Sequence, residues 1–244
     1  MINTSLKYSF YIYNMIGNKN NIKYNLSGYQ DWFFNKHLEN KKDSFDIFEK
    51  VKKHTTIALD IGSWLGINSI YLCKNFKHVI VIEPDPVSFK YLEENLFNSD
   101  CDNFSLCNKP ISNLSQIAIF GPESNWNESN SLIKSKKDNE NDIEIKTLSF
   151  TDIHNLYIRQ FSNDYFNIFI NIDINCGEEN IIVDVLHYAI IFNSYVYIKF
   201  YIDKWVDKNI YKYSELFKKF KTNIKNVTEY LDKNNTGSVL FYLN

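Results

Sequence analysis

The residues best suited to chemistry lie in one short segment, 60–66, with the sequence DIGSWLG, in which an apolar run gives way at residue 62 to a turn and then to a helical segment. A glycine at position 62 lets the chain turn tightly and lets a ligand approach the backbone without meeting a Cβ atom. The helix that follows would offer unpaired N–H groups and the positive end of its dipole. Because a pair such as Gly62 and Gly66 also occurs in plain strand-to-helix turns, a nucleotide-type site and a structural turn are both open at this point.

A carboxylate at the end of the next apolar segment, Glu83, favours the nucleotide-type site. A carboxylate there can accept two hydrogen bonds from a vicinal ribose diol, although a helix-capping or solvated glutamate is the structural alternative. The turn lacks the pattern G-x-G-x-x-G and a Walker lysine, which disfavours a phosphate cradle. Asp60, directly before the turn, suits a cationic ligand head better than a pyrophosphate. S-adenosylmethionine has that shape, with an ammonium, a sulfonium, a ribose and an adenine.

The elements that must position these residues follow from the hydrophobic pattern, in which apolar runs of strand length alternate with segments of helical period. We expect strands at 56–61, 78–83, 103–108, 116–120, 144–148, 166–174, 195–202, 226–231 and 237–243. We expect helices at 67–76, 87–97, 150–161, 178–191 and 211–220. This alternation predicts an α/β fold of Rossmann-like type, with a mostly parallel sheet, a C-terminal antiparallel hairpin and helices on both faces.

Two parts of the chain fall outside the alternation. Residues 1–54 are predicted to form a helical cap or lid, with helices at 31–38 and 45–51 and aromatic side chains that pack over the open end of the sheet. Residues 55–244 are then one compact Rossmann-like domain. Residues 121–142 are polar and are predicted to be a loop; the stretch 134–144 is either solvated or a lid over the acceptor.

The composition of the chain indicates which kinds of partner, metal and cellular location to expect. The 244 residues are 44% hydrophobic and 23% charged with a net charge of −2, as in ordinary globular proteins, and Arg159 is the one arginine. Nucleic acid is therefore not expected as a partner. The four cysteines lack zinc-ligand spacing, which predicts reduced thiols, no metal and a cytoplasmic location. Charged residues interrupt the most apolar stretch, 181–202, and the N-terminus lacks the pattern of a secretory signal, so no membrane span is expected. The oligomeric state is open, a homodimer included.

Several segments, in their order along the chain, resemble the FkbM-type family of S-adenosylmethionine-dependent methyltransferases, which are class I and Rossmann-like. The segments are ALDIGSWLG at 58–66, VIEPDP at 81–86, LEEN at 92–95, NKPISN at 108–113, KTLSFTD at 146–152 and IDINCGE at 172–178. Together they cover about residues 55–202. The resemblance implies the cofactor S-adenosyl-L-methionine and a class I methyltransferase sheet.

The resemblance also implies a set of residues at the cofactor, to which the sequence argument adds the first: Asp60, Gly62, Ser63, Trp64, Glu83, Pro84 and Asn108. The three residues 62–64 would wrap the methionine part. Glu83 would bind the ribose hydroxyls, Pro84 would lie beside the adenine, and Asn108 would lie near the adenine edge. Trp64 replaces an asparagine that is usual in the family.

For catalysis, the resemblance places Asp173 beside the methyl group and the acceptor, which makes it our candidate for the base that deprotonates an acceptor hydroxyl. His154 and Glu178 are the substitutes, and a strand-end carboxylate that caps the next turn is the structural alternative. The sequence departs from the family at Asn175-Cys176, where Glu-Gly is usual, and near Lys199, where an acid is common.

The expected function is therefore an S-adenosylmethionine-dependent O-methyltransferase. Its acceptor would be a small molecule or a glycan, such as a sugar hydroxyl of a surface polysaccharide or capsule precursor, which means polysaccharide modification. A catalytically impaired methyltransferase-like binding protein is the alternative that the change at 175–176 supports. An NAD-dependent oxidoreductase is a third class, disfavoured by the absent third glycine and by the terminal hairpin.

Overall fold

The structure is a computed structural model that describes residues 14–19, 22–27, 42–122, 131–134, 136–137, 140, 142–161, 168–174, 177–201, 228–231 and 236–241. The helices expected at 31–38 and 211–220, and the Asn175-Cys176 pair, lie outside the described residues.

The main sheet has seven strands among the described residues, in the order β11-β12-β10-β9-β3-β4-β5. Five parallel strands form its body: β3 (Ile57–Ile61), β4 (His78–Ile82), β5 (Phe104–Cys107), β9 (Ile168–Ile172) and β10 (Tyr195–Tyr201). The hairpin of β11 (Thr228–Leu231) and β12 (Thr236–Phe241) joins β10 through an antiparallel pairing. This arrangement confirms the predicted Rossmann-like α/β fold.

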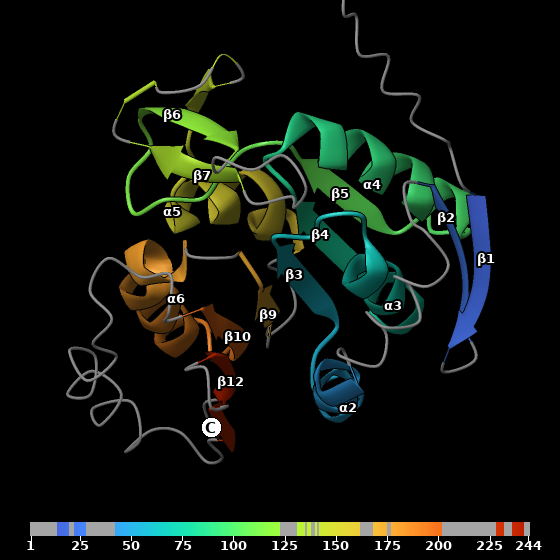
Figure 1. Cartoon of the computed structure of the whole chain (residues 1–244). Coiled ribbons are helices and arrows are strands. Elements are labelled where there is room, and N and C mark those ends of the chain that lie inside the picture. Colours follow the sequence, from blue (N-terminus) through green and yellow to red (C-terminus); the bar gives the residue numbers. More distant parts are fainter. Residues whose placement is uncertain are drawn as a thin grey trace, which may run out of the picture.

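Helices cover both faces of this sheet (Figure 1). On one face lie α2 (Lys42–Val51), α3 (Ile67–Asn75) and α4 (Pro86–Asn98). On the other lie α6 (Glu178–Ile191) and α5 (Phe150–Ile153), which continues as a π-turn, η1 (His154–Ile158), and a 3-10 turn, η2 (Arg159–Phe161). Alternate residues of each strand feed the two cores: Leu59 packs with the α6 side, and Ala58 with the α3 side. The period of two in the strands and the helical period between them produce these layers.

A second, antiparallel sheet of three strands stands beside the first, in the order β7-β6-β8. It consists of β6 (Ile117–Pro122), β7 (Ser131–Lys134) and β8 (Ile143–Lys146). The predicted loop at 121–142 is therefore wrong where β7 forms, and the strand expected at 144–148 belongs to this small sheet. Phe120 is buried and pairs with Ile133 of β7 and Ile143 of β8. Residues 131–134 therefore form a strand because they pair with β6, although the segment around them is polar.

The N-terminal region is not the purely helical cap that the sequence predicted. Strands β1 (Asn14–Lys19) and β2 (Ile22–Ser27) form an antiparallel hairpin beside α4. The side-chain oxygen of Asn95 accepts a hydrogen bond from the backbone N–H of Ser27, and the Ser27 hydroxyl donates to Glu94 at 2.8 Å. The Asn95 amide also donates to the carbonyl of Leu65 at 2.8 Å, so α4 connects this hairpin to the turn after β3.

The aromatic residues of α2 are covered, but by the face of the sheet and not over its open end. The ring of Phe48 lies 5.3 Å from that of Phe169, the second residue of β9, and 6.2 Å from that of Tyr197. Phe45 stacks on Tyr71 of α3 with 4.7 Å between the ring centroids. An amphipathic helix buries its apolar face where the largest apolar surface is available, which here is the sheet face between β9 and α3.

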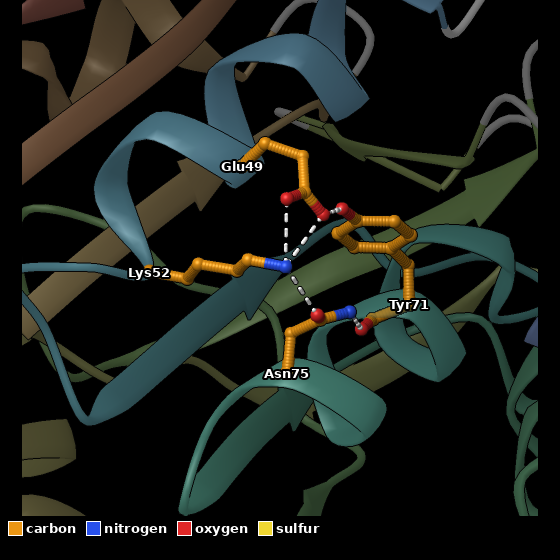
Figure 2. A network of polar contacts seen from close by, with 4 residues as sticks. All are labelled: Glu49, Lys52, Tyr71 and Asn75. Atoms are coloured by element: carbon orange, nitrogen blue, oxygen red, sulfur yellow. Dashed lines mark hydrogen bonds and ion pairs between the residues drawn. The ribbon is translucent and has the colours of Figure 1, made fainter. Parts of the chain in front are cut away.

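Polar contacts close the outer side of this junction (Figure 2). The Lys52 ammonium lies 2.7 Å from Glu49 and donates to the side-chain oxygen of Asn75 at 2.9 Å. The Tyr71 hydroxyl donates to the same Glu49 carboxylate, and the Asn75 amide donates to the Tyr71 carbonyl at 2.8 Å. Helix α2 is therefore joined to α3 by both an apolar and a polar contact.

The structure also bears on membrane-spanning helices, metal sites and the state of the cysteines. Within the ranges given above, no helix is both long enough and apolar enough to cross a membrane. In the same ranges no group of His, Cys, Asp and Glu side chains is arranged to hold a metal ion. Cys73, Cys101 and Cys107 are buried free thiols.

Candidate functional site

The candidate site is the edge of the main sheet at which the parallel strands end. The chain runs from β3 outward through β4 and β5 and then returns to the other side of β3 for β9 and β10. In open α/β sheets the crevice at such a switch point binds ligands. Residues that the sequence singled out lie at or near this edge, in sheet order: Asn108, Glu83, Gly62, Asp173 and Lys199. The first four directly follow strand ends, and Lys199 lies two residues before the end of β10.

The turn after β3 is held between the ends of β4 and β9. The N–H groups of Gly62 and Ser63 donate to the carbonyl of Ile82 at 3.0 and 3.2 Å, and the N–H of Asp173 donates to the carbonyl of Ile61 at 3.0 Å. Gly62 has a φ of +81°, and a Cβ atom built on it would lie 2.3 Å from the carbonyl oxygen of Asp173. The protein's own packing therefore requires this glycine.

The same turn leads directly into α3. Trp64 and Gly66 have φ angles of +50° and +96°, and Gly66 is the N-cap of the helix without a side-chain hydrogen bond. The Ser63 hydroxyl donates to the carbonyl of Asp60 at 3.0 Å, which stabilises the turn from within. The first turn of α3 carries no acidic residue, so its positive dipole end is not neutralised by its own side chains.

Glu83 is the most unusual group of the edge, because the residue is only 7% exposed and no cation contacts its carboxyl within the described part of the chain. Its two oxygens accept backbone hydrogen bonds from Trp64 at 2.7 Å and from Asp85 at 2.8 Å. Burial raises the pKa of this carboxyl to about 7, against the opposing effect of those N–H groups. A carboxylate offers about four acceptor positions, so two are left for a ligand.

Asn108 acts on the segment that follows β4. Its side-chain amide donates to the carbonyls of Glu83 at 2.8 Å and Pro84 at 3.2 Å. It therefore fixes the backbone that carries the Glu83 carboxyl and the partly buried Pro84.

Asp60 lies at the centre of the site but is withdrawn from it. Its side chain is fully buried, and its two oxygens accept hydrogen bonds from Ser69 of α3 at 2.5 Å and from Asn171 of β9 at 2.6 Å. Its direct contact with a cationic ligand head, as the sequence suggested, is not what the structure shows. Asp60 instead ties β3 to its neighbours. The side-chain nitrogen of Asn171 donates to Asp60, whereas its oxygen, Oδ1, is buried without a hydrogen-bond partner among the described residues.

Asp173 and Lys199 form an ion pair at the same edge. The register pairs Ile172 with Ile198, so the next residues along β9 and β10 stand side by side. The Lys199 ammonium lies 4.0 Å from Oδ2 of Asp173, and the two side chains are 32% and 12% exposed. The candidate base therefore has a cationic neighbour.

The structure does not bring His154 to Asp173. The His154 ring nitrogen Nδ1 lies 2.8 Å from the Tyr188 hydroxyl, and the ring stacks on Phe192 at 4.6 Å. Tyr188 lies ten residues after the start of α6, about 15 Å along the helix axis, and Phe192 follows the last residue of the helix, so both partners are at the end far from Asp173. Burial, with Arg159 nearby, lowers the pKa of His154. Glu178, by contrast, begins α6 at the near end, where its side chain is fully buried.

Two segments quoted for the family resemblance contact each other outside the ligand edge. Ile111 and Leu148 form an isolated parallel bridge, with the Leu148 N–H donating to the Pro110 carbonyl at 2.9 Å. Ser149 and Asp152 then form a capping box at the start of α5. Ile111 and Leu148 belong to the core on the α6 side of the sheet, whereas Asn108, the first residue of its segment, stands at the ligand edge.

Comparisons with known proteins give distant structural likenesses. No family model matches the sequence, and no curated protein matches it. An rRNA methylase from Streptococcus thermophilus is 9% identical with a TM-score of 0.44, over 78% of this chain and 88% of that one. A putative methyltransferase from Streptococcus mutans in complex with SAH is 11% identical with a TM-score of 0.46, over 82% of this chain and 97% of that one. A human methyltransferase 10 domain containing protein is 10% identical with a TM-score of 0.46, over 82% of this chain and 80% of that one. Likenesses at this level assign no family and no substrate.

Proposed function

We propose that the chain is an S-adenosylmethionine-dependent O-methyltransferase whose acceptor is a hydroxyl group of a sugar, in a surface glycan precursor or a related small metabolite. The observation that carries the proposal is the buried carboxyl of Glu83, joined to the Trp64 N–H at the switch point of the sheet. The donor and the acceptor class come from the family resemblance stated above.

The residues present fit the donor. A buried carboxyl that has spare acceptor positions, and that contacts no cation in the described part of the chain, suits a ribose diol and is poorly suited to a phosphate. The uncapped start of α3 suits the carboxylate of a methionine group. The buried Oδ1 of Asn171 has no hydrogen-bond partner among the described residues, and it adds an acceptor beside Asp60, next to an edge rich in carboxylates. This suits a ligand with an ammonium and a sulfonium.

When bound, S-adenosylmethionine supplies a methyl group on a sulfonium, which is transferred by in-line displacement. The chain's residues must align the acceptor oxygen with that methyl group and exclude water. The carboxylate of Asp173 would accept the proton of the acceptor hydroxyl during the transfer, and the neutral thioether of the spent donor would be the leaving group. The position of Asp173 against the Gly62 turn supports this role.

Calorimetry tests the donor first. S-adenosylhomocysteine should bind to the purified chain and NAD should not; binding of NAD alone would assign the site to an oxidoreductase. Glu83→Ala should abolish the binding, whereas Glu93→Ala, an exposed acid on α4, should preserve it.

Transfer of a radiolabelled methyl group to nucleotide sugars or cell-envelope fractions tests the reaction. Asp173→Asn should lower turnover by about 10²-fold or more with cofactor affinity retained, because it removes the proton acceptor only. Asp184→Asn on α6 is the matched control. Cofactor binding with no transfer to any fraction would instead support the catalytically impaired binding protein.

A further inference from the structure

We propose that Lys199 binds an anionic group of the acceptor, so that the substrate class is a sugar or related hydroxyl compound carrying a carboxylate or phosphate near the methylated hydroxyl. This inference rests on the proposed function. It names the substrate class of the same site.

The geometry places Lys199 where an acceptor must lie. In a parallel pair, side chains in register project from the same face of the sheet, and the register sets Lys199 beside Asp173. A hydroxyl that gives its proton to Asp173 therefore sits within reach of the Lys199 ammonium, 4.0 Å from the carboxylate. About a third of the lysine side chain is exposed, against 12% of the aspartate, so the ammonium is the more accessible of the two.

The carboxyl groups near the Lys199 ammonium suggest which charge it balances. Carboxyl groups follow the ends of β4 and β9: Glu83, Asp85, Asp173 and Glu178. Such an edge attracts a cationic donor and repels an anionic acceptor. A cation beside a general base weakens that base, because it favours the ionised carboxylate. Its presence is explained if it also neutralises a negative charge that the acceptor brings.

The chemistry of lysine fits this double contact. An ammonium has three N–H donors on a flexible stem, so it can contact Asp173, another neighbour and a ligand oxygen at the same time. Carboxylates and phosphates both accept such hydrogen bonds. A neutral hydroxyl gains far less from an ammonium, so the lysine discriminates between charged and neutral sugars.

The experiment measures the affinity of glucuronate, glucose 6-phosphate and glucose for the full chain saturated with S-adenosylhomocysteine, by ligand-observed NMR titration. The two anionic sugars separate a carboxylate from a phosphate as the recognised group. Lys199→Met removes the charge, Lys199→Arg keeps it, and Lys50→Met changes the same net charge at an exposed position of α2.

At least one anionic sugar should bind about tenfold or more tightly than glucose. That preference should disappear in Lys199→Met and persist in Lys199→Arg and Lys50→Met, with the affinity for S-adenosylhomocysteine unchanged in all three. Equal affinities for charged and neutral sugars, or a preference that survives Lys199→Met, would overturn the inference. Failure of the proposed function shows separately, as no binding of S-adenosylhomocysteine before any sugar is added.

Discussion

The backbone N–H of Trp64 donates a hydrogen bond of 2.7 Å to the carboxyl of Glu83, which makes the turn after β3 and the end of β4 one structural unit. A ligand that contacts this carboxyl must therefore lie against the turn as well. Any change in the protonation of Glu83 reaches the turn through the same bond.

Cofactor affinity should depend on the protonation of Glu83. Burial raises the pKa of this carboxyl to about 7, and only the ionised form accepts hydrogen bonds from both ribose hydroxyls. The affinity for S-adenosylhomocysteine should fall by up to about tenfold per pH unit below pH 7 and level off above it. Calorimetry between pH 5.5 and 8.5 measures this. Glu83→Gln should bind weakly with no such slope, whereas Glu93→Gln should behave as the parent.

The raised pKa also has a consequence for folding. The folded chain keeps the Glu83 proton at pH values where the unfolded chain has lost it, so this group's contribution to stability falls as the pH rises from 4.5 to about 7. Urea unfolding should show that Glu83→Gln lacks this loss.

Gly62→Ala should disrupt the site and the fold together. The added Cβ atom would meet the backbone carbonyl of Asp173, and φ is +81° there, so the strain should cost about 1–3 kcal/mol or more. Gly177→Ala is a suitable control, because its Cβ atom would meet the end of the flexible Ile174 side chain and its φ is −82°. Urea unfolding should rank the two variants in that order. Equal losses of stability would contradict this account of Gly62.

Helix α2 should be essential for stability of the main domain. Phe48 is fully buried against Phe169 and Tyr197, and truncation of such a side chain costs about 3–5 kcal/mol. Phe48→Ala should lower the free energy of unfolding by that amount, and Phe97→Ala, at a 61% exposed position, should lower it far less. A stably folded fragment 55–244 would refute this prediction and support a domain boundary at residue 54.

His154 should matter for stability at acid pH and not for transfer. Its pKa is lowered by burial, so the unfolded chain binds the proton more readily below about pH 6.5 and the fold loses stability as the pH falls. His154→Phe cannot take up that proton and should narrow the difference in unfolding free energy between pH 7.5 and pH 5.5. It should also keep methyl transfer intact; loss of turnover with an unchanged fold would return His154 to the list of catalytic candidates.

The order of strands and helices was predictable because strands buried on both faces of a parallel sheet are continuous apolar runs, which the sequence shows directly. Helix α6 begins and ends where the pattern placed it. Glu83 and Asp173, expected within the last residues of their strands, each directly follow the strand's last residue. Strand β7 was not predictable, since its pairing with β6 supplies what its own polar sequence lacks. The sequence could not show that His154 lies far from Asp173, because its position depends on how α5 and η1 pack along α6. The segment LEEN at 92–95 was part of the family resemblance, but it did not predict that Asn95 is a fully buried polar residue that joins three parts of the chain.

The double role of Asn95 has a consequence for biosynthesis. Ser27 of β2 contacts Asn95 of α4, which follows it in the chain by 68 residues. During translation the first strands therefore leave the ribosome long before the surface that receives them exists. Their hairpin must wait, exposed, until α4 has emerged, and its docking and the anchoring of Leu65 then become a single late event.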